Sequence, residues 1–80
     1  MKLRRDLSGA ALAQALRLYG YAITRQSGSH LRLTTICGGE HHLTIPDHAP
    51  LRVGTLAAIL AEVADHLKLD RDALLQSLFG

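Results

Sequence analysis

Residues 21–46 read YAITRQSGSHLRLTTICGGEHHLTIP, and three short runs within them alternate between apolar and polar side chains. The runs span residues 21–26, 30–36 and 41–46. Alternation with a period of two is typical of strands that bury one face and expose the other. Glycine-containing loops separate the runs, and Pro46 ends the third because proline cannot donate to a ladder. The segment therefore predicts a three-stranded antiparallel sheet.

Helical patterns lie on both sides of this predicted sheet. Before it, Ser8 is a candidate N-cap and Gly20 suits a left-handed C-cap. Two adjoining apolar stripes mark the buried side of this first helix: Leu7, Ala11, Ala15 and Leu18, and Leu12, Leu16 and Tyr19. After the sheet, apolar residues recur at i, i+3, i+4 and i+7 from Leu56, and a last helix begins near Asp70. The order α-β-β-β-α-α predicts an α+β two-layer sandwich with the helices on one face of the sheet.

Length and composition narrow the class of protein. Eighty residues with 48% hydrophobic content predict one domain over residues 1–80 and argue against disorder. The single cysteine, Cys37, cannot form an internal disulfide, and no apolar run has the length of a signal peptide or a membrane span. We therefore expect a soluble protein of the reducing cytoplasm without a membrane partner. The net charge of +2 permits a polyanionic ligand, while 4% aromatic content argues against recognition by base stacking.

The polar face of the predicted sheet carries side chains suited to RNA backbone chemistry. Alternation places His30 and Arg32 on one strand and His42 on the next, all pointing away from the core. The preceding residues 25–29 form a turn of small polar side chains whose backbone can approach a phosphate closely. A histidine can move a proton near neutral pH, and a guanidinium can hold a phosphate. Cleavage of an RNA backbone requires this combination of groups.

These residues, in this order, resemble the HicA toxins (the HicA/YcfA-like family). The resemblance runs from about Ser8 to Leu60 and rests on Gly20-Tyr21, Arg25-Gln26-Ser27-Gly28-Ser29-His30, Ile45-Pro46-Asp47-His48, Gly54-Thr55-Leu56 and Ile59-Leu60. It implies a fold like that of double-stranded-RNA-binding domains, ribosome-independent mRNA interferase activity, and neutralisation by a HicB antitoxin. The essential histidine of the family lies in a Gly-Ser-His motif, so the resemblance implies that His30 is catalytic.

The resulting hypothesis is the toxin of a type II toxin–antitoxin system, an endoribonuclease without a metal or other cofactor. His30 acts either as general base on the ribose 2′-OH or as general acid to the leaving oxygen. The expected RNA-binding residues are Arg25, Gln26, Ser27, Gly28, Ser29, Arg32 and His42. The alternative is a non-catalytic protein, either a double-stranded-RNA-binding-like domain or an orphan protein-interaction module.

The other histidines have competing interpretations. His41, His42 and His48 are candidate metal ligands, but their spacing matches no standard zinc pattern and Cys37 is isolated. We therefore expect His41 at a loop edge, His48 fixing a loop or contacting a partner, and His66 facing solvent near a helix C-terminus.

The two ends of the chain carry two further expectations. The basic residues Lys2, Arg4 and Arg5 form either a solvated terminus or a weak phosphate contact. The apolar residues of the last helix either close the core or stay exposed for an oligomer contact or an antitoxin. These last residues are Leu74, Leu75, Leu78 and Phe79.

Overall fold

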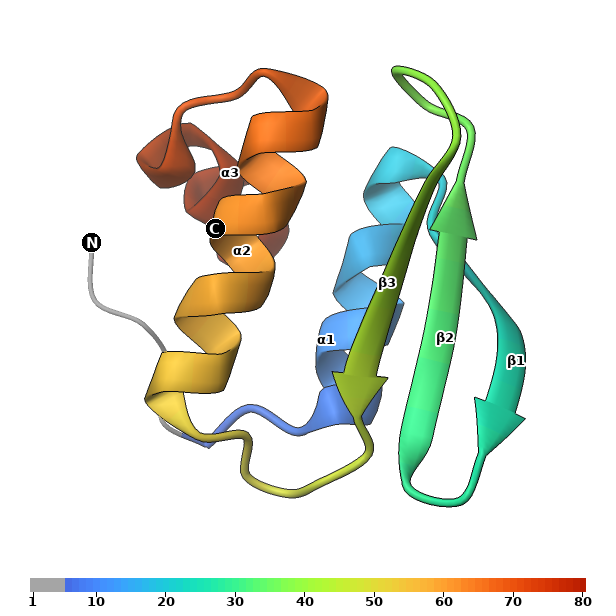
Figure 1. The fold of residues 1–80 in the computed structure, drawn as a ribbon. Helices are drawn as coiled ribbons and strands as arrows, with labels where there is room; N and C mark the ends of the chain where they lie inside the picture. The colour runs from blue at the N-terminus through green and yellow to red at the C-terminus, as the bar shows by residue number, and fades with distance from the viewer. Residues whose placement is uncertain (1–5) are drawn as a thin grey trace.

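The computed structural model describes residues 6–80, in which three strands form an open antiparallel sheet in the order β1-β2-β3 (Figure 1). The elements are α1 (Gly9–Leu16), a 3-10 turn η1 (Arg17–Tyr19), β1 (Ala22–Ser27), β2 (His30–Thr35), β3 (His41–Pro46), α2 (Val53–Leu67) and α3 (Arg71–Phe79). This order confirms the predicted α+β class. The basic residues 2, 4 and 5 lie outside the described part of the chain.

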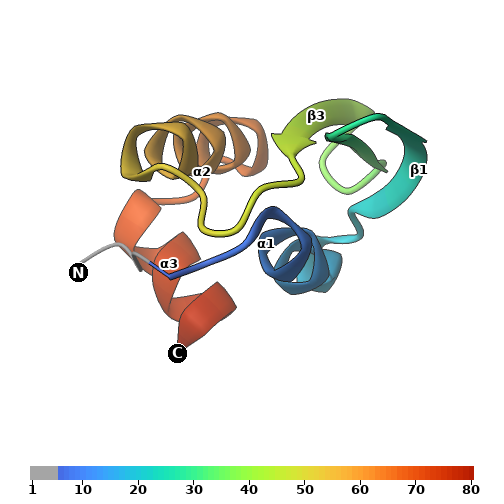
Figure 2. The ribbon, with the colours of Figure 1, turned by 90° about the horizontal axis from the view of Figure 1, so that it is seen from below.

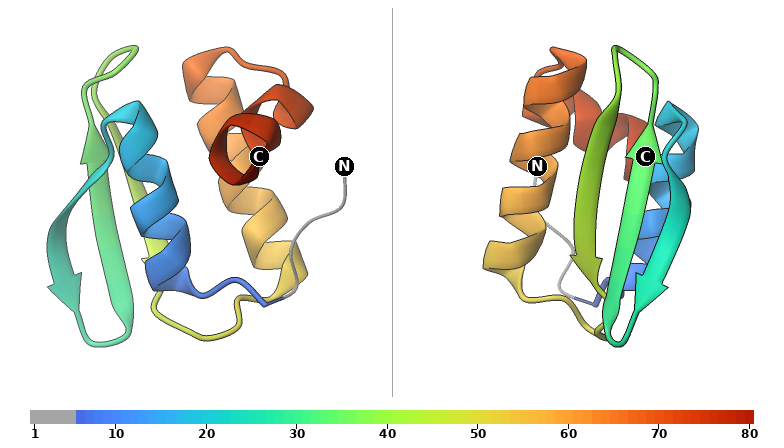
Figure 3. Two further views of the ribbon diagram at one scale, coloured as in Figure 1. Left: turned by 180° about the vertical axis from the view of Figure 1, so that it is seen from behind. Right: turned by 45° about the vertical axis from the view of Figure 1, so that its right-hand side comes forward.

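The helices gather on one side of the sheet. Helix α1 lies against the inner face, α2 packs beside β3, and α3 packs against α1 and α2 (Figure 2). The opposite face carries no helix from residues 6–80 (Figure 3). We call this open side the outer face of the sheet. No helix in the described part of the chain is both long and apolar enough to cross a bilayer.

The core lies between the inner face of the sheet and the helices. Leu31 and Leu33 of β2 and Leu43 and Ile45 of β3 are each at most 3% exposed, as the alternation predicts. The helices contribute Leu12, Leu16, Leu56, Leu60, Val63 and Leu74, all fully buried. Burial of one such side chain stabilises the fold by about 1.5–3 kcal/mol. The sheet is therefore held mainly through β2 and β3.

Helix α1 has the predicted ends but a narrower buried side. Ser8 accepts a hydrogen bond from the Ala11 N–H at 3.0 Å, and Gly20 ends the segment with a φ of +82°. The buried stripe is Gly9, Leu12, Ala13 and Leu16. Leu18 is 63% exposed because the chain tightens into η1 after Leu16, which rotates the following side chains away from the core. Ala11 is exposed as well and Ala15 is half-buried, so only Leu7 of the predicted stripe Leu7, Ala11, Ala15 and Leu18 is buried, and this stripe is wrong.

Helix α3 closes the core on the side away from the sheet. Asp70 caps it by accepting hydrogen bonds from the N–H groups of Asp72 and Ala73 at 3.1 and 3.3 Å. Leu74 and Leu75 are buried, and the last two apolar side chains of the helix are partly buried against the same core. These four apolar side chains thus pack against the core of their own chain, and an oligomer contact through this helix stays a prediction.

Candidate active site on the outer face of the sheet

A β-bulge in β1 determines which side chains reach the outer face. Ile23 pairs with Leu33 and Arg25 pairs with Arg32, so Thr24 is an extra residue with no residue opposite it in the register, although its hydroxyl lies 3.0 Å from Thr34 Oγ1 on β2. Regular alternation would place Ile23 and Arg25 on the same face. With the extra residue, Ile23 turns toward α1 while Arg25 joins Arg32 on the outer face.

Residues from all three strands line a shallow hollow of about 190 Å³ on the outer face. They are Arg25, Ser27, His30, Arg32 and Thr44, and we call this site the outer-face hollow. Strand register explains the grouping: Ser27 lies opposite His30, while Arg32 lies between Arg25 and Thr44. The lining side chains are exposed to solvent. Four of the five were predicted as site residues, and Thr44 was not.

The hollow presents two guanidinium groups with no lining carboxylate. Arg25 and Arg32 are direct partners across β1 and β2. Like charges at directly opposed positions destabilise a sheet, and a bound anion would relieve that repulsion. Guanidinium groups match the geometry of phosphate oxygens and are well suited to bidentate binding. The hollow therefore offers two guanidinium groups, whose geometry suits phosphate oxygens, beside the imidazole of His30.

The turn that precedes His30 is free of neighbouring atoms at Gly28 and is held at Ser29 by a backbone hydrogen bond. Gly28 has a φ of +57°, and no atom lies within 4 Å of the position that a Cβ would take there. The carbonyl of Ser29 accepts a hydrogen bond from the Asp47 N–H at 2.6 Å. This bond ties the turn to the segment after β3 and so fixes the place from which the His30 side chain extends.

Four predicted RNA-binding residues do not line the hollow: Gln26, Gly28, Ser29 and His42. Gln26 pairs with Leu31, whose side chain is buried on the inner face, so Gln26 belongs to the helix side of β1. His42 lies on the outer face, but its Nδ1 is 2.9 Å from Thr34 Oγ1 and its Nε2 is 2.9 Å from Glu40 Oε2. Gly28 and Ser29 form the turn between β1 and β2. Contact of these four residues with RNA stays a prediction.

Two further histidines are held between the β2–β3 hairpin and α2. His41 is the first residue of β3, at the edge of the preceding loop as predicted, and it is half-buried. Its Nδ1 lies 2.8 Å from the Tyr21 hydroxyl and its Nε2 3.1 Å from Glu62 Oε2. Its ring stacks on that of His66 at 4.3 Å. His66 Nε2 donates to the Cys37 carbonyl at 2.9 Å, so the expectation that His66 faces solvent is wrong. The reason is that the hairpin tip bends onto the end of α2.

Tyr21 is the buried member of this group. Burial raises the pKa of Tyr21 to about 12, with smaller contributions from the negative charges of Glu62 and Cys37. The group therefore joins the hairpin to α2 and lies apart from the outer-face hollow. Across residues 6–80, no three potential metal ligands among histidine, cysteine, aspartate and glutamate come together.

Comparison with known proteins gives one family match. The model of the family described as "HicA toxin of bacterial toxin-antitoxin" matches residues 9–64. The match includes the whole sheet and every residue that lines the outer-face hollow. No curated protein and no solved structure matches the chain. The expected likeness to double-stranded-RNA-binding domains therefore stays a prediction.

Proposed function

The chain belongs to the HicA toxin family and is the toxin of a toxin–antitoxin pair, and from this premise we propose that it cleaves mRNA in the outer-face hollow. The observation that carries the proposal is the grouping of His30 with Arg25 and Arg32 in one hollow without a lining carboxylate. His30 also closes the Gly28-Ser29-His30 motif in which the family resemblance places the essential histidine. A HicB-like antitoxin is the partner that such a toxin requires.

In the proposed reaction, the RNA phosphate is transferred from the 5′-oxygen of one nucleotide to the 2′-oxygen of the nucleotide before it. Arg25 and Arg32 hold the non-bridging oxygens of one phosphate, which places the adjacent 2′-OH near His30. The 2′-oxygen attacks phosphorus, the bond from phosphorus to the 5′-oxygen breaks, and a 2′,3′-cyclic phosphate and a 5′-hydroxyl are formed. One proton leaves the 2′-OH and one reaches the 5′-oxygen, and His30 carries out one of these transfers while water carries out the other.

The two arginines also stabilise the charge that develops in the transition state. The attacked phosphate gains negative charge on its equatorial oxygens, and a phosphate bound between Arg25 and Arg32, which are opposed across β1 and β2, would have both guanidinium groups next to that charge. A positioned acid or base contributes about 10²–10⁴-fold to the rate. With a single histidine in the hollow, we expect a slow ribonuclease whose toxicity depends on accumulated cleavage.

Substitution of two exposed histidines provides the test. His30 lines the hollow, while His48 is equally exposed but lies in the loop after β3. Induction of the wild-type chain should arrest growth, and the purified protein should cleave RNA in the presence of EDTA. His30→Ala should abolish both effects and His48→Ala should preserve both, with unchanged thermal unfolding of each variant.

Two results would contradict the proposal. The first is a wild-type protein that is harmless to cells and leaves RNA intact in vitro, which would favour a non-catalytic interaction module. The second is a His30→Ala variant that cleaves RNA as fast as the wild type, which would place the chemistry elsewhere. The cleavage products supply an independent check, since the proposed reaction leaves a 2′,3′-cyclic phosphate before the cut.

A further inference from the structure

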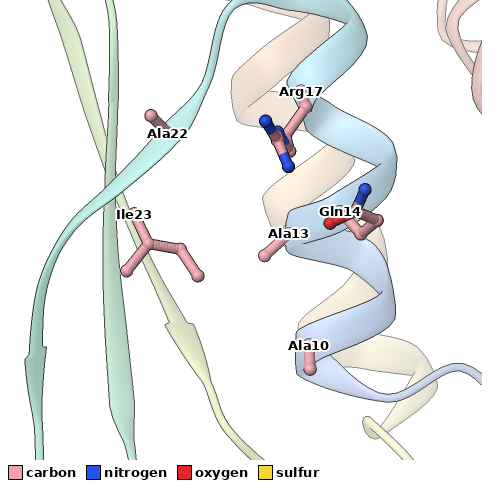
Figure 4. A pocket seen from close by; sticks show the side chains of 6 residues that line it. All are labelled: Ala10, Ala13, Gln14, Arg17, Ala22 and Ile23. Carbon is pink, nitrogen blue, oxygen red and sulfur yellow. The ribbon is translucent and has the colours of Figure 1, made fainter.

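A groove lies on the other side of β1, between this strand and α1 (Figure 4). It has a volume of about 220 Å³ and is lined by Ala10, Ala13, Gln14, Arg17, Ala22 and Ile23. Helix α1 presents alanine side chains here, which leaves space that larger side chains would fill. Ile23 points from β1 toward α1 and is 52% exposed. We call this site the α1–β1 groove.

The strand that borders the groove is a free sheet edge. Within residues 6–80, strand β1 pairs only with β2, and all six of its residues are exposed. The strand contains neither lysine nor proline, two residues that often protect a free edge. Its bulge at Thr24 is a third such device, but Arg25, Gln26 and Ser27 beyond it pair regularly with β2. An exposed edge offers unpaired backbone N–H and C=O groups to a further strand, and such strand addition is a common mode of peptide recognition.

The positive charge beside the groove, and the position of the groove next to the outer-face hollow, indicate which kind of strand this edge would bind. Among the described residues, the groove is lined by Arg17 and by no carboxylate, and Arg25 of β1 lines the neighbouring outer-face hollow. In an added strand, successive side chains point to opposite faces of the sheet. One set would enter the apolar groove, and the other set would lie along the outer face beside Arg25. The surface therefore fits a strand in which apolar and acidic residues alternate.

We propose that the antitoxin adds such a strand to β1, with an apolar side chain in the α1–β1 groove and an acidic side chain at Arg25. The existence of an antitoxin rests on the family and not on the proposed ribonuclease activity. The acidic side chain competes with phosphate for Arg25, because one guanidinium cannot serve both anions fully. The antitoxin thus blocks the outer-face hollow from its edge.

The test measures binding of the antitoxin encoded by the neighbouring reading frame to toxin variants made in the His30→Ala background. Ile23→Asp removes an apolar wall of the groove and sets a carboxylate against the apolar side chain of the added strand. This change should weaken binding at least about 30-fold, because burial of a charge is costly even where Arg17 lies in the same groove. Ile36→Asp is the matched control, since Ile36 is 83% exposed beyond the end of β2, and it should bind like the parent. Thermal unfolding confirms that both variants are folded.

Hydrogen exchange locates the contact directly. The antitoxin should protect the amides of residues 22–27, and this result does not depend on whether the toxin cleaves RNA. Equal affinity of the Ile23→Asp variant and its parent would overturn the proposal, as would protection confined to α2 and α3. If residues 22–27 were instead protected in the free toxin at high concentration, and the antitoxin did not add to this protection, the edge would bind a second copy of the chain and not the antitoxin.

Discussion

Gly9 permits a close approach between α1 and the end of β3, where Pro46 and Asp47 lie. A Cβ at Gly9 would lie closer than 3.0 Å to the carbonyl oxygen of Pro46, a separation that real Cβ atoms essentially never show. It would also lie 3.3 Å from the Cα of Asp47. These neighbours are backbone atoms, so a side-chain rotation cannot relieve the overlap. Gly9→Ala therefore forces α1 and this segment apart.

The contacts of Gly9 give the size of the expected loss in the free energy of unfolding. Overpacking of a close contact costs about 1–3 kcal/mol. Separation also weakens the hydrogen bond from the Gly9 N–H to the His48 carbonyl, now 2.9 Å long, which contributes about 0.5–1.5 kcal/mol. We expect Gly9→Ala to lower the free energy of unfolding by about 2–4 kcal/mol. The segment also holds the turn before His30 through the Asp47–Ser29 bond, so RNA cleavage should fall as well.

Gly54 provides the matched control in the first turn of α2. No atom lies within 4 Å of a Cβ added there, and alanine is favoured over glycine in a helix by up to about 1 kcal/mol. Gly54→Ala should therefore stabilise the protein slightly. In thermal unfolding followed by circular dichroism, we expect Gly9→Ala to lower Tm by roughly 10–25 °C and Gly54→Ala to raise it by a few degrees. A Tm for Gly9→Ala within about 3 °C of the wild type would refute this account of the contact.

Two other substitutions test the buried tyrosine and the outer-face hollow. Because the pKa of Tyr21 is raised to about 12 from an ordinary 10.0, its contribution to stability is complete below pH 10 and is lost as pH rises through 12, a change of about 2–3 kcal/mol. In urea unfolding, the free energy of unfolding of Tyr21→Phe should fall less between pH 10 and pH 12 than that of the wild type, while Tyr19→Phe should show the wild-type fall. The same pH dependence in both variants would be inconsistent with a buried Tyr21 hydroxyl. Arg25→Gln should raise the KM for RNA about 10–100-fold, which is the loss of affinity expected when one charge-assisted hydrogen bond is removed. The change in kcat should be smaller. Arg71→Gln on α3 should leave KM unchanged, and an equal rise in both variants would indicate that only net charge matters.

The sheet and its buried face could be predicted from the sequence because their determinants are local. Leu31 and Leu33 alternate with polar neighbours, and this period leaves one arrangement that buries them. Ser8 and Asp70 cap their helices because each side chain lies within reach of free N–H groups a few residues on. The exposure of Leu18 could not be predicted in this way, since it depends on where the helix tightens before the sheet.

The grouping of His30 with Arg32 could also be predicted, because alternate residues of a strand share one face. Arg25 was predicted as a site residue from a turn over residues 25–29, but it lies within β1, and its position on the outer face depends on a bulge at Thr24 that forms when β1 pairs with β2. The stacking of His41 on His66 depends in turn on how the hairpin tip bends onto α2. Contacts of this kind join residues far apart in the sequence and have no periodic signal.

The bulge at Thr24 decides on which face of the sheet Arg25 lies. Because no residue of β2 lies opposite Thr24, Ile23 pairs with Leu33 and Arg25 with Arg32, which puts Ile23 on the groove and Arg25 on the hollow. Deletion of Thr24 would make Ile23 and Arg25 neighbours in a regular strand, where successive side chains also point to opposite faces, so both surfaces would be kept. Among related chains we therefore expect β1 to tolerate the loss of this extra residue, while the two positions beside it keep an apolar and a basic side chain.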